Sequence, residues 1–245
     1  MDDFGEVLLL MEKIDPKYRE YAAIKKEINE ALDDSFSLDK LNYYFENEYF
    51  DDAYYYCEEH LGDSIGEGSS RAVFQIDDGR CLKIALNKKG IQQNKVESET
   101  NKDNYLLFPL IFGKSDNNYW VLTEYVLPAQ ESDFPRCVGL DFDDFYNFIL
   151  DLEDQKYERY KIQYVVDNIR EDKSGTLKSL YDYVVKNHIP CGDMLRICNW
   201  GMTVRNGKET LVLLDSGWNK ETMKMYGGYV SPTKSKYSDK VSRPD

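Results

Sequence analysis

The chain has 245 residues, of which 42% are hydrophobic, and its formal net charge is −14. This length suits one large domain or two small ones with a buried core. The acidic charge argues against nucleic acid or an anionic membrane as a partner, because both require clustered Lys and Arg.

The first quarter of the chain has the pattern of helices. Apolar residues recur at helical spacing in residues 4–33 and 38–62, and Gly62 is well placed to end the last helix. The many Tyr and Phe of residues 38–62 predict helix faces packed on a core, since a base-stacking surface would have basic neighbours. We expect residues 1–62 to form an N-terminal helical extension.

Residues 63–126 change to an alternation of apolar and polar residues, which is typical of strands. Ala72, Phe74 and Ile76 are expected on one face of a strand, with Arg71, Val73 and Gln75 on the other. Asp78-Gly79 signals a hairpin turn. The other expected elements are a polar helix at 88–102 and two strands at 106–113 and 119–126.

The rest of the chain is mainly helical in pattern. Helices are expected at 141–155, 160–170 and 176–188. Residues 201–217 predict a hairpin with Asn206-Gly207 at its turn. Residues 231–245 lack apolar periodicity and are expected to be a flexible tail.

Five cysteines are scattered along the chain without a CxxC pair. No stretch resembles a signal peptide or a membrane span. We therefore expect a cytoplasmic protein with reduced thiols.

Candidate phosphate-binding residues lie in the first hairpin. Gly66 and Gly68 would let backbone amides approach an anion, although a flexible turn is the better explanation of the two glycines taken alone. Lys83 lies in mid-strand and needs a partner if it is buried, for which Glu97 or Glu99 is available. The alternative for Lys83 is an exposed lysine on an edge strand.

Other candidates lie at strand ends and in one loop. The backbone groups of Glu124 and Val126 would be free to pair with a flat heterocycle, unless the strand simply ends in solvent. Asp215 and Asn199 offer oxygen ligands for Mg²⁺, and Asp193 can accept a proton from a hydroxyl. Their structural alternatives are a turn cap, a loop amide and a helix N-cap, respectively.

The order of these features resembles the protein-kinase-like superfamily. "IGEGSSRAV" (65–73) resembles its glycine-rich loop, "CLK" (81–83) the strand with the phosphate lysine, and "LLDSG" (213–217) the metal-binding strand end. The resemblance runs from about residue 63 to residue 219. "GIQQN" (90–94), "NWG" (199–201) and the same "LLDSG" further resemble motifs of small, minimal kinase-like proteins encoded by bacteriophages.

The resemblance implies a role for each matched residue. Gly66, Gly68, Val73 and Cys81 would surround the nucleotide. Lys83, held by Glu97, would contact the α and β phosphates of ATP. Thr123 would lie behind the pocket, and Glu124 and Val126 would bind adenine. Asn199 and Asp215 would hold Mg²⁺, and Asp193 would be the catalytic base beside the catalytic Lys83.

The chain also departs from the family pattern. Arg71 replaces the third glycine of the loop, and Ser216 replaces the phenylalanine of Asp-Phe-Gly. Asp193 precedes Asn199 by six positions, whereas the family has five. The segment that grips a peptide substrate in protein kinases is nearly absent.

We expect an α+β, two-lobed protein-kinase-like fold. Its parts would be the helical extension (1–62), an N-lobe with a five-stranded antiparallel sheet (63–126), a reduced helical C-lobe (127–230) and the tail (231–245). The implied function is transfer of a phosphoryl group from ATP, with Mg²⁺, to a hydroxyl on an unidentified protein or small molecule. The alternatives are an inactive pseudokinase that senses nucleotide or serves as an interaction module, and an acidic inhibitor that reuses the fold.

Overall fold

The computed structural model describes residues 36–101, 104–155, 162–217 and 220–227. The helices expected within residues 4–33 and the tail expected at 231–245 lie outside these ranges. No helix within the described ranges is long and apolar enough to cross a bilayer.

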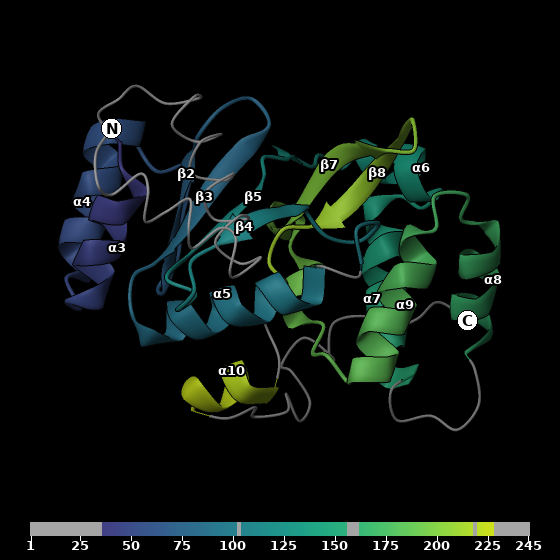
Figure 1. Cartoon of the computed structure of the whole chain (residues 1–245). Helices are drawn as coiled ribbons and strands as arrows, with labels where there is room; N and C mark the ends of the chain where they lie inside the picture. The colour runs from purple at the N-terminus through teal and green to yellow at the C-terminus, as the bar shows by residue number, and fades with distance from the viewer. Residues whose placement is uncertain (1–35, 102–103, 156–161, 218–219, 228–245) are drawn as a thin grey trace, which may run out of the picture.

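The chain begins its described part with a helical hairpin. Helix α3 spans Leu38–Glu46, and the Ser37 hydroxyl caps it by accepting the Lys40 N–H at 3.4 Å. Helix α4 spans Phe50–Leu61 and ends at Gly62, whose φ of +85° favours glycine. Both helices were expected, and they lie beside the first sheet (Figure 1).

The first sheet has five antiparallel strands in the order β1-β2-β3-β5-β4, as predicted. The strands are β1 (Gly66–Glu67), β2 (Arg71–Gln75), β3 (Arg80–Ala85), β4 (Ile111–Lys114) and β5 (Trp120–Glu124). Ala72, Phe74 and Ile76 share the buried face that packs against α3 and α4, which confirms the predicted alternation. The aromatic residues of the helical hairpin therefore complete the core of this lobe.

Helix α5 (Lys88–Asn101) covers the opposite face of the sheet (Figure 1). The side chains that it buries are mostly polar, among them Gln93, Asn94, Glu97 and Asn101. Buried polar groups require hydrogen-bond partners. A buried helix with a polar sequence therefore indicates a network of hydrogen bonds and ion pairs rather than a purely hydrophobic core.

The prediction of a strand over 106–113 is wrong in its first half. Leu107 and Phe108 form a turn closed by the Asn104 carbonyl, which accepts both of their N–H groups at 2.9 and 3.1 Å. Both side chains are fully buried in the core of the second lobe. Pro109 follows without an N–H to donate to a strand neighbour, and β4 begins only at Ile111.

The second lobe combines helices with a small sheet. Its helices are α6 (Asp133–Val138), α7 (Phe142–Gln155), α8 (Gln163–Glu171) and α9 (Thr176–Asn187), whereas α10 (Lys220–Met225) packs against α5 of the first lobe (Figure 1). Its antiparallel strands are β6 (Leu127–Pro128), β7 (Trp200–Arg205) and β8 (Lys208–Leu213). Positive φ angles at Asn206 and Gly207 confirm the predicted hairpin turn. The sequence analysis did not predict α6, β6 or α10.

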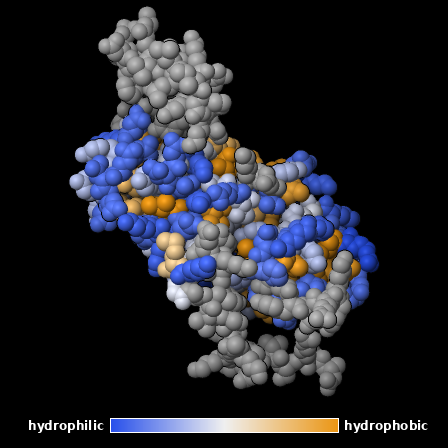
Figure 2. All heavy atoms as spheres, turned by 60° about the horizontal axis from the view of Figure 1, so that its bottom comes forward, coloured by the Kyte–Doolittle hydropathy of each residue, from blue (hydrophilic) through white to orange (hydrophobic). Residues whose placement is uncertain are grey.

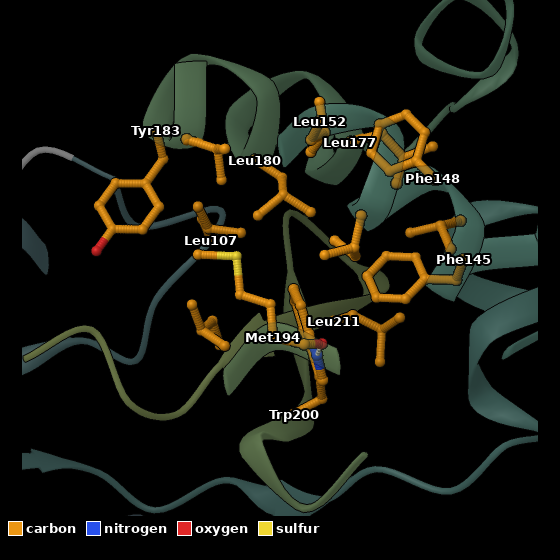
Figure 3. Packing of buried hydrophobic residues seen from close by; sticks show 14 of the residues in the cluster. Leu107, Phe145, Phe148, Leu152, Leu177, Leu180, Tyr183, Met194, Trp200 and Leu211 are labelled. Atoms are coloured by element: carbon orange, nitrogen blue, oxygen red, sulfur yellow. Dashed lines mark hydrogen bonds between the residues drawn. The ribbon is translucent and has the colours of Figure 1, made fainter. Parts of the chain in front are cut away.

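Trp200 is fully buried in the second core, where Figure 3 shows it below Met194 and Leu211. Its ring meets Phe145 edge-on at 5.0 Å between centroids, and its Nε1–H donates to the Met194 carbonyl at 2.8 Å. This contact fixes the loop that carries Asp193 and Asn199, which runs through two 3₁₀ turns at Gly192–Leu195 and Ile197–Asn199.

The described chain thus has the α+β, two-lobed architecture that the sequence predicted. A five-stranded lobe with helix α5 is joined through Tyr125 and Val126 to a lobe of helices and the β7–β8 hairpin. The face shown in Figure 2 is mostly hydrophilic, with small groups of hydrophobic residues between.

Candidate functional site

Lys83 and Glu97 form a buried ion pair between β3 and α5. The Lys83 Nζ donates to Glu97 Oε1 at 2.5 Å and to the Leu214 carbonyl at 2.8 Å. Lys83 is therefore not an exposed edge lysine, and its partner is Glu97 rather than the exposed Glu99. Burial by itself would raise the pKa of Glu97, but Lys83 and Arg71 outweigh that effect and lower the pKa.

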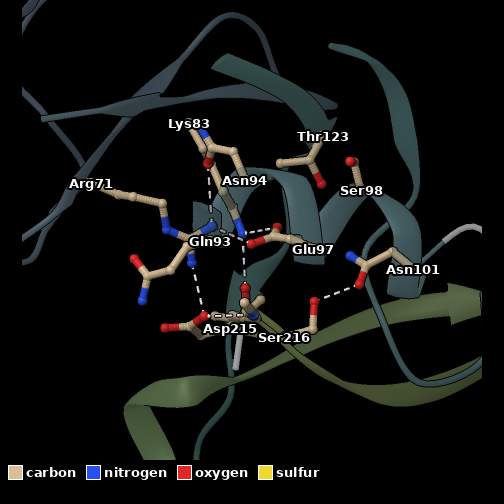
Figure 4. A network of polar contacts seen from close by, with 12 residues as sticks. Arg71, Lys83, Gln93, Asn94, Glu97, Ser98, Asn101, Thr123, Asp215 and Ser216 are labelled. Carbon is tan, nitrogen blue, oxygen red and sulfur yellow. Dashed lines mark hydrogen bonds and ion pairs between the residues drawn. The ribbon is translucent and has the colours of Figure 1, made fainter. Parts of the chain in front are cut away.

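Arg71 is a second buried cation in the same network (Figure 4). Its Nη1 donates to Glu97 Oε2 at 2.5 Å, and its Nη2 donates to Asp215 Oδ1 at 2.8 Å. Burial would lower the pKa of Arg71, but the two carboxylates outweigh burial and raise it. The sequence analysis placed Arg71 on the same strand face as Val73 and noted it as a replaced glycine, but it gave Arg71 no partner and no role in the site.

A cavity of about 650 Å³ opens between the lobes and collects the predicted site residues. The predicted residues that line it are Gly66, Gly68, Val73, Cys81, Lys83, Glu124, Val126, Asp193, Asn199 and Asp215. Glu97 does not line the cavity and lies behind Lys83, where it is fully buried. Residues distant in sequence thus meet in one place, as the resemblance implied, while their roles stay predictions.

The loop around Asp193 reaches the cavity despite its extra residue. The Asn199 Nδ2 donates to the Asp193 carbonyl at 2.8 Å, and the Asn199 carbonyl accepts the Leu214 N–H at 2.8 Å. Asp193 lies inside a 3₁₀ turn, so it is not the N-cap of a helix. Burial and the nearby Asp215 raise the pKa of Asp193, and Arg196 only partly opposes this.

The Asp215 side chain has two partners. Its Oδ1 accepts the Gly217 N–H at 3.1 Å as well as the Arg71 Nη2, so its turn-capping role is real. Ser216, in place of the family's phenylalanine, is buried, and its Oγ donates to Asn101 Oδ1 of α5 at 2.5 Å. The strand end is therefore tied to the first lobe by polar contacts.

Glu124 differs from the prediction that its backbone groups are free. Its N–H donates to the Leu110 carbonyl at 2.9 Å, because β5 continues its pairing with the segment before β4. Its carbonyl accepts the Cys81 S–H at 3.6 Å between the sulfur and the oxygen. The Glu124 side chain forms a buried ion pair with Arg205 of β7, a link between the lobes that the sequence analysis missed.

Residues 90–94 hold the glycine-rich loop in place. The Gln93 Oε1 accepts the Ser70 hydroxyl at 2.6 Å, and Ser70 Oγ in turn accepts the Tyr226 hydroxyl at 2.8 Å. The Asn94 Nδ2 donates to the carbonyls of Asn118 and Tyr119 at 3.1 Å each. These contacts give a structural reason for the GIQQN motif.

We expect Gly90→Ala to destabilise the protein, although Ala for Gly in a helix is normally favourable by about 1 kcal/mol. A Cβ at Gly90 would lie 2.0 Å from the Ser70 carbonyl oxygen and 3.0 Å from the Ala85 Cα. Because both are backbone atoms, the loop must shift, at a cost of about 1–3 kcal/mol. Urea unfolding measures the change, with Gly192→Ala as the control since nothing lies within 4 Å of its added Cβ. Equal stability of Gly90→Ala and wild type would contradict this packing.

Comparison with known proteins gives a match at the level of solved structures. No family model and no curated protein matches the chain. The structure of APH(2")-IIia with GDP and kanamycin matches at 12% identity and a TM-score of 0.30, over 63% of this chain and 66%, just under two thirds, of that one. The APH(2")-IIa complex with streptomycin and ATP matches at 11% identity and a TM-score of 0.31, over 68% and 70% of the two chains.

Proposed function

We propose that the cavity binds ATP and that the chain transfers its terminal phosphoryl group to a hydroxyl acceptor. The observation that carries this proposal is the buried Lys83–Glu97 pair at the wall of a cavity lined by Gly66 and Gly68. A lysine fixed in this way already holds its ammonium group in one conformation before the phosphates bind. Phosphoryl transfer depends mainly on such positioning.

The remaining lining residues suit the other parts of the nucleotide. Val73 and Cys81 supply apolar walls for a flat base, and burial raises the pKa of the Cys81 thiol to about 11, so it stays neutral. The Glu124 carbonyl and the backbone of Val126 would pair with the edge of adenine. This assignment keeps the predicted hinge but omits the Glu124 N–H, which Leu110 already uses.

Asp193 is the proposed proton acceptor. Its pKa is raised, which brings a carboxylate closer to the range in which it accepts a proton from an attacking hydroxyl. The contact of Asn199 with the Asp193 carbonyl holds this part of the loop at the cavity.

The residues proposed for Mg²⁺ do not fit a resident ion in the arrangement described. Asp215 and Asn199 are of the right oxygen-donor type. The Asp215 carboxylate, however, already holds the Arg71 guanidinium at 2.8 Å. Within the described part of the chain, no three His, Cys, Asp or Glu side chains are grouped to hold a metal ion.

The same Arg71–Asp215 contact favours a second candidate, a pseudokinase that binds nucleotide without turnover. In that case the loop of residues 192–199 and the β7–β8 hairpin would sense or transmit nucleotide occupancy. The acidic-inhibitor alternative rests on the net charge alone. The resemblance to bacteriophage proteins and the cytoplasmic location stay predictions, and five free cysteines are in keeping with the latter.

A thermal-shift titration with ATP tests the proposal. Nucleotide at 100 times its Kd should add roughly 2.7 kcal/mol of stability. Lys83→Ala should abolish the shift, while Lys114→Ala, an exposed lysine on β4, should retain it. No shift in the wild type would overturn nucleotide binding.

A turnover assay then separates the two candidates. An enzyme should release ADP and lose that activity in Asp193→Asn, whereas a pseudokinase should bind ATP without releasing ADP. Mass spectrometry of the protein after incubation with ATP detects autophosphorylation, which needs no external acceptor.

A further inference from the structure

We infer that the Arg71 guanidinium takes the place of a divalent metal ion at Asp215, so that nucleotide phosphates bind here without Mg²⁺. This inference rests on the proposed nucleotide site. It assigns a binding role to a residue at which the family pattern has a glycine, and it changes the ion requirement of the site.

Arg71 places a fixed positive charge against one oxygen of Asp215, the carboxylate that a metal would need. Asp215 Oδ1 accepts N–H groups from both Arg71 and Gly217, at 2.8 and 3.1 Å. Mg²⁺ binds oxygen at about 2.0–2.1 Å in a near-octahedral shell that tolerates little distortion. A metal on this carboxylate would therefore have to displace Arg71 or lie next to its charge.

Arg71 is held firmly in this position. Its side chain is only 10% exposed, and Glu97, its other carboxylate partner, is fully buried. A third contact joins Nη1 to Asn94 Oδ1 at 3.4 Å. If Arg71 moved aside, Glu97 would keep Lys83 as its only cationic partner among these residues. The guanidinium of Arg71 would also have to be hydrated or paired again, which is costly for a buried charge.

Arg71 also has the chemistry to meet a phosphate. The guanidinium has five N–H donors in a planar fork that matches phosphate oxygens. Its hydrogen bonds to described residues engage only the two Nη atoms. Arg71 and Lys83 both line the cavity, so two cations stand at the position where the phosphates would lie.

Binding of ATP measured by calorimetry, in EDTA and in excess Mg²⁺, is the direct test. We expect affinities in the two buffers to differ by less than about tenfold, because a metal contact worth 1.4 kcal/mol or more would change the affinity at least tenfold. Affinity at least about tenfold higher with Mg²⁺ would overturn the inference while leaving the proposed function standing. Absence of binding in both buffers would overturn the proposed function, and the inference with it.

Two variants distinguish between two roles of Arg71: a cation that takes the place of a metal ion, and a partner in a salt bridge that is only structural. Asp215→Asn removes the charge that a metal needs but keeps an oxygen that can accept hydrogen bonds. We expect the ratio of its ATP affinities with Mg²⁺ and in EDTA to stay as in the wild type, with Asp167→Asn on the surface of α8 as the matched control. A loss of about tenfold or more that occurs only with Mg²⁺ would show that a metal uses this carboxylate and would overturn the inference.

Arg71→Gln is the second variant, and circular dichroism should first establish that it folds. We expect its affinity in EDTA to fall by about tenfold or more and to recover when Mg²⁺ is added. Arg170→Gln, an exposed arginine of α8, is the control and should behave as wild type. Unchanged affinity of Arg71→Gln in EDTA would overturn the inference. If Arg71→Gln does not fold, Asp215→Asn and the wild-type comparison still decide the matter.

Discussion

Replacement of Glu97 by Ala should lower the free energy of unfolding by about 3–5 kcal/mol, the range for removal of one partner from a buried ion pair. The reason is that Glu97 is the shared anion of two buried cations. Without it, Lys83 and Arg71 would face each other with the positive charge of both only partly balanced by Asp215. The loss should also weaken nucleotide binding, because the ammonium of Lys83 would no longer be held in one position.

Urea denaturation followed by circular dichroism measures this effect. Glu99→Ala is a matched control, because Glu99 lies two positions further along the same helix and is exposed. Its substitution should change stability by no more than about 0.5 kcal/mol. Similar unfolding midpoints for the two variants would show that Glu97 does not hold the two cations.

The first lobe was largely predictable because its information is local. Strands with a period of two can be recognised in the sequence, and so can Asp78-Gly79 at the turn between two of them. The polar character of α5 was also visible. What the pattern did not reveal is that these polar side chains are buried, since burial depends on the sheet and loop that pack against the helix.

The candidate site was predictable as a set of residues but not as a network. The order of glycines, lysine and acids along the chain indicated which residues meet in the cavity. It gave no partner for Arg71, because the distance in sequence to Asp215 is 144 positions. It also gave no sign that Glu124 would use its backbone N–H on Leu110 and its side chain on Arg205.

The misassigned strand at 106–113 has the same cause. An apolar run predicts burial but does not say in which core. Leu107 and Phe108 belong to the second lobe, where the Leu107 carbonyl accepts the Leu213 N–H at 2.8 Å. The segment before β4 therefore crosses from one lobe to the other, and only the three-dimensional structure shows that crossing.

The ion pair of Glu124 and Arg205 joins β5 of one lobe to β7 of the other, so we expect its loss to destabilise the protein strongly. Arg205 Nη1 donates to Glu124 Oε1 at 2.8 Å, a second contact joins Nη2 to Oε2, and Thr203 Oγ1 donates to Oε1 at 2.7 Å. Both side chains are nearly buried, with 8% of Arg205 and 13% of Glu124 exposed. Arg205→Met should therefore cost about 3 kcal/mol, at the lower end of the range for a broken buried pair.

The cost should depend on pH in a defined direction. Burial by itself would raise the pKa of Glu124, but the hydrogen bonds from Arg205 and Thr203 outweigh burial and lower the pKa. A carboxyl group with a lowered pKa stabilises the folded state above its usual pKa of about 4.3, and this stabilisation is lost as the pH falls through the folded-state value. The deficit of Arg205→Met, which is the amount by which its free energy of unfolding lies below that of the wild type, should thus be full at neutral pH and become smaller in acid.

Urea denaturation of wild type and Arg205→Met over a series of pH values tests both parts. Lys208→Met is the control, because Lys208 is the exposed cross-strand neighbour of Arg205 on the same hairpin. A deficit that stays constant from neutral pH into acid would contradict an electrostatic link and leave only lost packing of the arginine stem. A deficit that shrinks in acid would establish that the two lobes are held together by charge at the edge of the cavity, so that opening of the cleft requires this pair to break.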